Sequence, residues 1–327
     1  MKRLPILILT LLLTLLLALL IAGCGEQPGA PRAAKDGVRT VRIAYLPITH
    51  ALPLFEASQT LAAAGGPVRV ELIRYGSWPE LMDALNTGKV DGASVLIELA
   101  VKAREQGIDL TAAALGHLGG NVIIAGKGIE RVEDLKGKIF AIPHKQSSHK
   151  LLLDQLLAEH GMTERDLTVV EMSPPEMPAG LAQGQIAGYC VAEPFGAKAV
   201  TLGTGHILAR SEDLWPGSLC CALVFNGAFA RANHDLARSV TQGYLAAGEE
   251  LAAHPDEATD LAQTVFKAKP AVLNLSLQWI SYDDLAIRPD AYDELIRRMT
   301  DTGLIQNAPA YEDFVDPTLL PASSERT

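Results

Sequence analysis

The sequence predicts an α/β protein made of two similar lobes, preceded by an export signal. From Val41 onward, short runs rich in Val and Ile alternate with amphipathic Leu/Ala stretches, which is the pattern of parallel sheets covered by helices. Part of this pattern occurs twice at a constant offset of 96 residues, as from Glu80 to Glu176. After Asn226 the pattern changes to helices alone.

The first residues predict the compartment. Lys2 and Arg3 precede an almost unbroken Leu/Ile run, as in a secretory signal, and Ile21-Ala22-Gly23-Cys24 resembles a bacterial lipobox. We therefore expect a signal peptide over residues 1–23, lipidation at Cys24 and a lipid-anchored linker over residues 24–39. A transmembrane anchor is the alternative, because the apolar run is nearly long enough to span a bilayer. The predicted location is the cell envelope outside the cytoplasm, periplasmic or on the outer face of the cytoplasmic membrane.

Composition excludes some partners. The chain has 28 basic and 38 acidic residues, so nucleic acid is not an expected partner. Cys190, Cys220 and Cys221 lie in apolar runs without CxxC spacing or a histidine at ligand spacing. We expect buried, inert thiols, with one disulfide involving Cys190 as the alternative, and neither a metal nor a cofactor. The length allows two lobes, and we expect a monomer.

Eight apolar runs are predicted to form strands. They cover residues 41–47, 68–76, 92–96, 121–126, 138–143, 167–172, 188–192 and 220–226. The repeat pairs Gly88 with Gly184 and Gly92 with Gly188 without a gap. A chance match between Ala-rich helices is the alternative, but the ungapped register favours two similar lobes. Ligands of such proteins bind where the carboxyl ends of the strands face a cleft.

The stretch from Phe140 to Leu157 carries the main candidate site. A helix is predicted to begin near Ser147 or Ser148, and its first backbone N–H groups, with His149 and neighbouring lysines, favour an anion. His144 and His149 are five residues apart, which is poor spacing for a metal site. No nucleophile motif is present, so no catalytic residue is expected. A solvated loop with a capping serine is the alternative.

Other candidate ligand-binding residues open or close predicted elements of the two lobes. They are Thr49 and His50 before a helix, Ser77 and Trp78 before another, His117 and Gly119 in "GHLGGN", and Tyr189 and Glu193 in "GYCVAEPF". Each has an ordinary structural alternative, such as packing for Trp78 or a simple turn for Gly119.

These residues resemble a known family. The lipobox, "THALPLF", "SWPELMDALNTGKVDGASV", "GHLGGNVIIAGKGIERVEDLKGKIFAIP" and "PPEMPAGLAQGQIAGYCVAEPF" look like solute-binding proteins of ABC importers in the nitrate/sulfonate/taurine (NMT1-like) class. The resemblance covers nearly the whole chain after Val41. One departure is Ala187, where relatives usually carry Asp, although the first repeat keeps Asp91.

The resemblance implies a type II periplasmic-binding-protein fold, with two α/β lobes that close over one ligand. Lobe I would comprise residues 40–122 and 226–320, and lobe II residues 123–225, with crossovers near Val122–Gly126 and Leu223–Asn226. The implied function is lipid-anchored capture of a small anion, similar to nitrate, bicarbonate or a sulfonate, for an ABC permease and its ATPase.

Three alternatives remain open at this stage. The ligand could be a heteroaromatic vitamin precursor, a thiamine pyrimidine or a flavin, held by Trp78, Tyr189 and Glu193. An enzyme similar to thiamine-pyrimidine synthases is a second alternative, although such enzymes are cytosolic. The third is a signalling or adhesion lipoprotein that transports nothing.

Overall fold

The computed structural model describes residues 37–321 of the chain. The predicted signal peptide, Cys24 and the first part of the predicted linker lie outside the described residues. Within 37–321, no helix combines the length and apolar character that crossing a bilayer requires.

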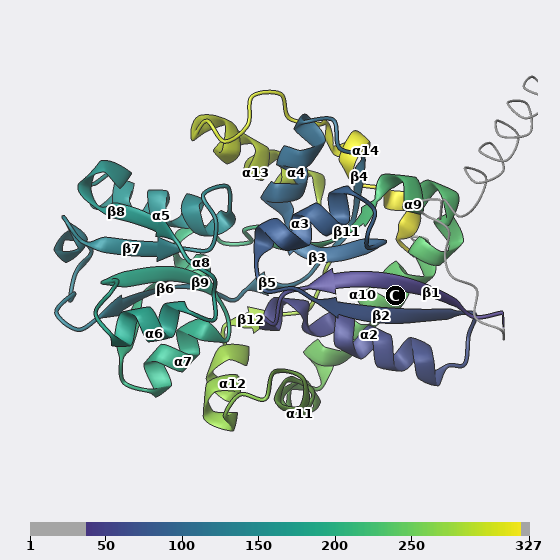
Figure 1. Cartoon of the computed structure of the whole chain (residues 1–327), viewed down its shortest axis with the longest axis horizontal. Helices are drawn as coiled ribbons and strands as arrows, with labels where there is room; N and C mark the ends of the chain where they lie inside the picture. Colours follow the sequence, from purple (N-terminus) through teal and green to yellow (C-terminus); the bar gives the residue numbers. More distant parts are fainter. Residues whose placement is uncertain (1–36, 322–327) are drawn as a thin grey trace, which may run out of the picture. The chain divides into compact units, whose positions relative to one another are not determined.

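The first lobe contains a five-stranded sheet in the order β2-β1-β3-β11-β4 (Figure 1). β1 runs parallel to β2 and β3, whereas β11 runs antiparallel to β3 and β4. Its strands are β2 (Val68–Arg74), β1 (Arg39–Tyr45), β3 (Gly92–Leu96), β11 (Cys221–Asn226) and β4 (Leu110–Leu115). Because helices cover both faces, the central strand β3 is buried along its whole length.

The second lobe repeats this topology. Its sheet has the order β10-β6-β9-β7-β8, with parallel pairing of β7 to β8 and β9, and antiparallel pairing of β6 to β9 and β10. Its strands are β10 (Gly205–Arg210), β6 (Asn121–Gly126), β9 (Gly188–Ala192), β7 (Ile139–Ile142) and β8 (Thr168–Glu171). All eight predicted strands form; β4 and β10 were not predicted.

The repeat seen in the sequence is therefore a repeat of topology. Reading each sheet from its parallel edge, β2, β1, β3, β11 and β4 correspond to β8, β7, β9, β6 and β10. Gly92 lies beside Ile43 in the first sheet, and Gly188 lies beside Phe140 in the second. At both glycines a Cβ atom would meet neighbouring atoms at 3 Å or less, which explains why the repeat keeps them.

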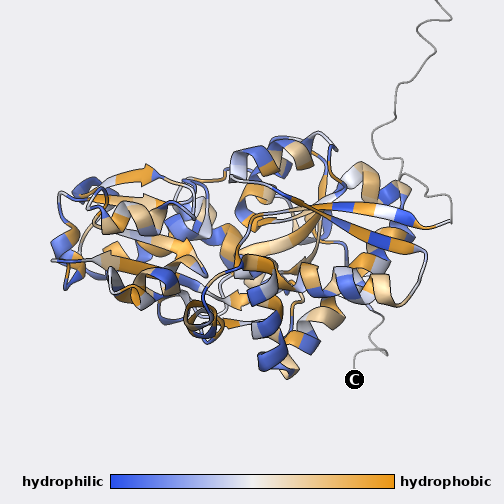
Figure 2. Ribbon diagram, turned by 60° about the horizontal axis from the view of Figure 1, so that its bottom comes forward, coloured by the Kyte–Doolittle hydropathy of each residue, from blue (hydrophilic) through white to orange (hydrophobic). Residues whose placement is uncertain are grey.

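Helices cover both faces of each sheet (Figure 1). In the first lobe these are α2 (Leu52–Ala63) and α10 (His234–Ala253) on one face, with α3 (Trp78–Asn86) and α4 (Ile97–Glu105) on the other. In the second lobe these are α5 (Ser148–Glu159) on one face, and α6 (Met177–Ala182) and α7 (Phe195–Thr201) on the other. The strands at the centre of each lobe are largely hydrophobic, and the surrounding helices alternate between hydrophobic and hydrophilic residues (Figure 2).

The remaining elements lie around the lobes and their junction. They are α8 (Ser211–Leu214), α9 (Gly227–Ala232), α11 (Pro255–Phe266), α12 (Pro270–Leu277), α13 (Pro289–Asp301), α14 (Tyr311–Phe314), and the short strands β5 (Leu118–Gly119) and β12 (Ile280–Ser281). The C-terminal helices were expected to cover the first lobe, and α10 does so by packing on α2. α12 instead packs on α7 of the second lobe.

The crossovers lie earlier in the chain than the sequence indicated. Val122–Gly126 belongs to β6 and Leu223–Asn226 to β11, and both are strands inside the sheets. These apolar runs are almost entirely buried, so they pair within a sheet. The two connections between the lobes lie just before them, in the glycine-rich residues 116–120 ahead of β6 and in residues 215–220 ahead of β11.

Backbone contacts at Thr49 and Glu193 join the two lobes. The Thr49 amide and hydroxyl both donate to the main-chain carbonyl of Glu193, at 2.9 and 3.0 Å. The Glu193 amide donates to the carbonyl of Gly120 at 3.0 Å. The Glu193 carboxyl is fully buried and accepts from the amide of Ala197 in the first turn of α7. Burial raises the pKa of this carboxyl to about 8, so it is protonated at neutral pH.

Adding a side chain at Gly188 should destabilise the second lobe. A Cβ atom there would lie 2.8 Å from the carbonyl oxygen of Ile124 and 2.9 Å from the ring of Phe140. We expect Gly188→Ala to lower the free energy of unfolding by about 1–3 kcal/mol in urea denaturation. Gly66→Ala is the control, because nothing lies within 4 Å of its Cβ position, and it should stay within about 0.5 kcal/mol of wild type.

The buried carboxyl of Glu193 should make stability fall as the pH rises from about 4.5 to about 8. In this window the folded protein keeps a proton that the unfolded chain has released. Glu193→Gln should remove at least about 1 kcal/mol of that decline, the equivalent of roughly one pKa unit, in urea denaturation across the window. Glu249→Gln, an exposed change on α10, should leave the decline intact. Equal pH profiles for wild type and Glu193→Gln would contradict the assignment.

Candidate functional site

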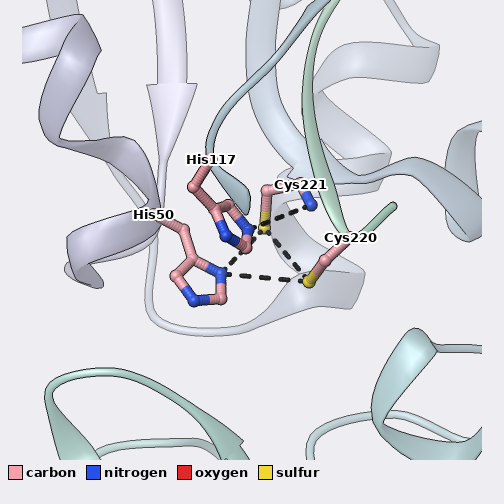
Figure 3. A group of neighbouring side chains, drawn as sticks. All are labelled: His50, His117, Cys220 and Cys221. Atoms are coloured by element: carbon pink, nitrogen blue, oxygen red, sulfur yellow. Dashed lines mark hydrogen bonds between the residues drawn. The ribbon is translucent and has the colours of Figure 1, made fainter. Parts of the chain in front are cut away.

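Four side chains with nitrogen or sulfur ligand atoms meet at one edge of the first sheet (Figure 3). His50 follows β1, His117 follows β4, Cys220 precedes β11 and Cys221 is its first residue. Because β11 is antiparallel to β3 and β4, its amino end lies at the same edge as their carboxyl ends. The four ligand atoms lie within 4.8 Å of one another, and all four residues are buried.

The distances inside this His/Cys cluster are short. His50 Nδ1 lies 3.6 Å from the Cys221 sulfur and 3.9 Å from the Cys220 sulfur, and the two sulfurs are 3.9 Å apart. The rings of His50 and His117 stack with their centroids 3.4 Å apart. All three cysteines of the described chain are free thiols, so Cys190 forms no disulfide with either of the other two.

Two successive carbonyl groups fix the tautomers of the two histidines. His50 Nε2 lies 2.8 Å from the carbonyl oxygen of Gly120, and His117 Nδ1 lies 2.8 Å from that of Gly119. A carbonyl oxygen only accepts, so each of these nitrogens carries the hydrogen. His50 Nδ1 therefore keeps a lone pair that is directed at the sulfurs, whereas the lone pair of His117 Nε2 accepts from the amide of Cys221 at 3.4 Å.

Gly119 and Gly120 are required for this arrangement. Both have positive φ, +67° and +74°, which disfavours other residues. A Cβ atom on Gly120 would lie 3.0 Å from His50 Nε2, and one on Gly119 would lie 2.7 Å from the carbonyl of Trp279. The glycine pair predicted as a turn thus positions two imidazole rings.

The two thiols of the cluster differ in proton affinity. Burial raises the pKa of the Cys220 thiol, but hydrogen bonds with Cys221, His117 and His50 outweigh burial and hold this pKa well below its usual value. Burial and the neighbouring Cys220 raise the pKa of the Cys221 thiol. Burial and the adjacent His50 lower the pKa of His117 to about 4, so this ring is neutral. The cluster therefore pairs a thiol of lowered proton affinity, Cys220, with the neutral imidazole of His117.

The second lobe contributes Ser148 and His149 from the start of α5. Both are fully buried, and neither the Ser148 hydroxyl nor either His149 ring nitrogen has a hydrogen-bond partner among the described residues. Burial lowers the pKa of His149 to about 4, with smaller effects from Cys220, His50 and His117, which places this ring near the His/Cys cluster. Ser148 and His149 are therefore buried polar residues, and the ring of His149 is electrostatically coupled to the cluster of the first lobe.

Glu98, in the first turn of α4, completes this buried region. Burial raises the pKa of its carboxyl well above the usual value, and Cys220 raises it further. The hydroxyl and amide of Ser148 lie close enough to lower this pKa slightly, although no hydrogen bond of normal geometry joins them to either carboxyl oxygen. We call Glu98, Ser148, His149 and the His/Cys cluster together the chamber.

The positive charge that the sequence suggested at α5 is not in the chamber. Lys150 forms ion pairs with Asp154 at 2.6 Å and Glu164 at 2.9 Å. Lys145 is exposed, and its amide donates to Glu171. His144 Nδ1 accepts from the amide of Gln146. Ser147 caps α5 as predicted, and its hydroxyl donates to the carbonyl of His144.

The other predicted site residues have structural partners or lie in the core. Thr49 bonds to Glu193 across the lobes, and its carbonyl accepts from Tyr282. Trp78 lies in the core, and its indole nitrogen has no partner among the described residues. Tyr189 is buried and donates to the carbonyl of Phe195. Ser77 precedes α3, where its side chain makes no capping bond.

A separate groove of about 370 Å³ opens on the surface where the lobes meet. It is lined by Pro47, Arg74, Pro175, Pro194, Phe195, Lys198, Leu202, Val265, Phe266, Lys267, Ala268, Lys269 and Val272. None of its cationic side chains forms an ion pair within residues 37–321. The groove shares no residue with the chamber, so the available positive charge and the buried ligand atoms lie in different places.

Sequence reasoning missed Cys220 and Cys221 as site residues. They were assigned to an apolar strand without a histidine nearby, because His50 and His117 are distant in the chain. The sequence did hold one indication of the site, which is where these residues lie relative to the strands. His50, Cys220 and Cys221 lie near the ends of predicted strands, and His117 follows β4, which was not predicted.

The model of the NMT1-like family matches residues 34–266 of this chain. A ligand-binding component of an ABC-type import system from Staphylococcus aureus, solved with zinc bound, is 40% identical with a TM-score of 0.81, covering 86% of this chain and 97% of that one. The periplasmic nitrate-binding protein NrtA from Synechocystis is 18% identical with a TM-score of 0.75, covering 86% and 87%, which shows a shared fold.

Among curated proteins, the bicarbonate transport ATP-binding protein CmpC of Synechocystis is 31% identical over 205 residues, or 56% of this chain and 31% of that protein. This chain spans about a third of the length of the first curated relatives it matches. The fold is that of periplasmic binding proteins, as the resemblance implied. Because the family model covers most of the chain, this protein belongs to the NMT1-like family.

Proposed function

We propose that this protein is the solute-binding component of an ABC importer and that it captures one small solute in the chamber between its lobes. The solute would then be delivered to a membrane permease driven by a cytoplasmic ATPase. The family, the two-lobed fold and the relatives described above support this proposal.

The observation that carries the proposal is the set of unpartnered polar groups in the chamber. Both ring nitrogens of His149, both carboxyl oxygens of Glu98 and the hydroxyl of Ser148 are buried without a hydrogen-bond partner in the described part of the chain. A buried group without a partner costs about 1–3 kcal/mol, so folded proteins rarely keep several together. A solute that bonds to them would recover this free energy and hold the lobes together.

Burial of the chamber implies that a solute enters only when the lobes separate. Away from the backbone contacts of Thr49 and Glu193 in the chain, Arg298 of α13 donates to Gln155 of α5 at 3.0 Å and lies 4.2 Å above the ring of Trp215. Opening the lobes would break these contacts. A solute that bridges both lobes shifts the equilibrium to the closed form, because it gains contacts only there.

The predicted lipid anchor belongs to the same proposal. A binding protein held at the outer face of a membrane by lipidated Cys24 would keep its solute close to the permease. The lipobox resemblance at Ile21–Cys24 supports this location, and so do the importer components among the relatives.

The solute class is the finer part of the proposal. The names of the nitrate and bicarbonate relatives, and the start of α5, support the predicted small anion. A bound anion would need a cation beside it. The described part of the chamber offers none, because its histidines His117 and His149 are neutral, Glu98 is an acid, and Lys150 is paired with Asp154. The S. aureus relative, solved with zinc, supports a metal ion as the second candidate.

The heteroaromatic alternative has less support. Trp78 belongs to the core of the first lobe and Tyr189 to that of the second, and Glu193 caps α7. These three side chains therefore form no common pocket. For the synthase alternative, the described chain provides only the adjacent thiols Cys220 and Cys221.

Removing the polar groups at the start of α5 should weaken binding of the solute. We expect Ser148→Ala combined with His149→Ala to reduce the binding free energy by more than about 1 kcal/mol, because these donors and acceptors have no other partner. The solute is first identified by thermal shift among nitrate, bicarbonate, an alkanesulfonate, a thiamine pyrimidine and Zn²⁺, and the change is then measured by calorimetry. His160→Ala, at the exposed end of α5, is the control and should bind normally. Unchanged affinity in the double variant would contradict the α5 pocket.

Removing Arg298 should favour the open form. Arg298→Ala loses the contacts with Gln155 and Trp215, so the ligand-free protein should show a larger radius of gyration in small-angle X-ray scattering. Arg297→Ala is a matched control, since within residues 37–321 this neighbour pairs only with Glu294 and Asp301 of its own helix. If both variants scatter like wild type, Arg298 does not hold the lobes closed.

A further inference from the structure

We propose that His50, His117, Cys220 and Cys221 bind a thiophilic transition-metal ion such as Zn²⁺ or Cu⁺, and that this ion is the captured solute. The inference rests on the proposed function, because it names the solute class of the same chamber. It assigns a role to two adjacent thiols that the sequence analysis treated as inert.

The spacing of the ligand atoms fits a tetrahedral ion. With Zn–S bonds of about 2.3 Å and Zn–N bonds of about 2.0–2.1 Å, a tetrahedral site has sulfur–sulfur distances of about 3.8 Å and sulfur–nitrogen distances of about 3.6 Å. The two sulfurs here are 3.9 Å apart, and His50 Nδ1 lies 3.6 and 3.9 Å from them. An ion among these atoms needs small shifts of His50 and the two sulfurs, and a rotation of the His117 ring, which stacks on that of His50 with the centroids 3.4 Å apart.

The ligand types select the class of ion. Two thiolates and two imidazoles suit Zn²⁺ and Cu⁺, whereas Mg²⁺ and Ca²⁺ require oxygen ligands. On binding, each thiol that is still protonated releases its proton, and the sulfur lone pair forms the metal bond. Two thiolates then balance the charge of a divalent ion, so the buried complex is neutral and avoids much of the cost of a buried charge.

The surroundings of the cluster are built as in metal sites. Ligating histidines usually donate their second ring N–H to a carbonyl or carboxylate, which fixes the ring. The carbonyls of Gly119 and Gly120 do this for His117 and His50 before any ion is present. The lone pair of His50 Nδ1 is therefore available at once, whereas that of His117 Nε2 must first give up its long bond from the amide of Cys221, at 3.4 Å.

All four ligands belong to the first lobe, and this suggests an order of events. The ion can load onto the open first lobe alone. The second lobe then closes over it with His149, whose ring nitrogens have no partner in the described chain. The unpartnered His149 is a second observation, independent of the cluster, that points to an occupant of the chamber.

The test uses the full-length protein, reduced and treated with a chelator that is then removed. Zn²⁺ binding is measured by calorimetry, and Co²⁺ serves as a spectroscopic probe, because thiolate ligation gives charge-transfer absorption and tetrahedral geometry gives intense visible bands. We expect one ion per chain, two thiolates in the Co²⁺ spectrum, and an affinity loss of more than about 100-fold in Cys220→Ser and Cys221→Ser, exceeding the effect typical of outer-shell changes.

Cys190→Ser is the matched control, since Cys190 is the third buried free thiol and lies in β9 of the second lobe. It should bind Zn²⁺ like wild type. Thermal unfolding of each metal-free variant verifies folding, and the wild-type Co²⁺ spectrum tests the ligand set without any variant. Absence of thiolate bands, or equal affinity loss in Cys190→Ser, would overturn the assignment.

The two proposals fail in different ways. If an anion or a vitamin precursor stabilises the protein in the presence of chelator while Co²⁺ yields no thiolate band, the metal site is wrong and the solute-binding function stands. If neither metal nor any other solute in the panel stabilises the protein, both are wrong.

Discussion

The carbonyl group of Gly120 links the ligand cluster to the junction of the lobes. Its oxygen accepts from His50 Nε2 at 2.8 Å and from the amide of Glu193 in the second lobe at 3.0 Å. The Gly120 amide donates to the carbonyl of Trp279, just before β12. This is possible only with a left-handed backbone and no side chain, so one glycine fixes both a histidine tautomer and the position where the chain passes between lobes.

The chamber is lined by polar groups, and burial favours the uncharged forms of two of its histidines and of Glu98. The imidazoles of His117 and His149 stay neutral because protonation would place a charge among fully buried groups, and the same cost raises the pKa of Glu98. Lys150 satisfies its charge on the outer side of α5. The chamber therefore selects by coordination and hydrogen bonding, and its thiols are the groups best placed to compensate a cation.

The two lobes share a topology but use equivalent positions differently. α2 and α5 begin at the same repeat offset, at Leu52 and Ser148. Ahead of α2 the chain supplies Thr49 for the lobe contact and His50 for the cluster, whereas the start of α5 supplies buried groups without a partner in the described chain. Asp91 holds Arg42 of β1 at 2.8 Å, and the second lobe has Ala187 at the corresponding position. Equivalent scaffolds thus carry different chemistry on their loops.

Local pattern was enough to place eight strands, the repeat, the start of α5 and the candidate histidines, because alternation, capping and glycine requirements act over a few residues. It missed β4, where the Ala-rich run "LTAAAL" becomes a strand by pairing with β11. It placed Trp78 and Tyr189 beside a ligand, whereas packing puts them in the cores. It also could not relate Cys220 and Cys221 to His50, because some 170 residues of chain lie between them. Only the antiparallel return of β11 brings those thiols to the imidazoles, since contacts between distant strand ends depend on sheet order, which no local stretch encodes.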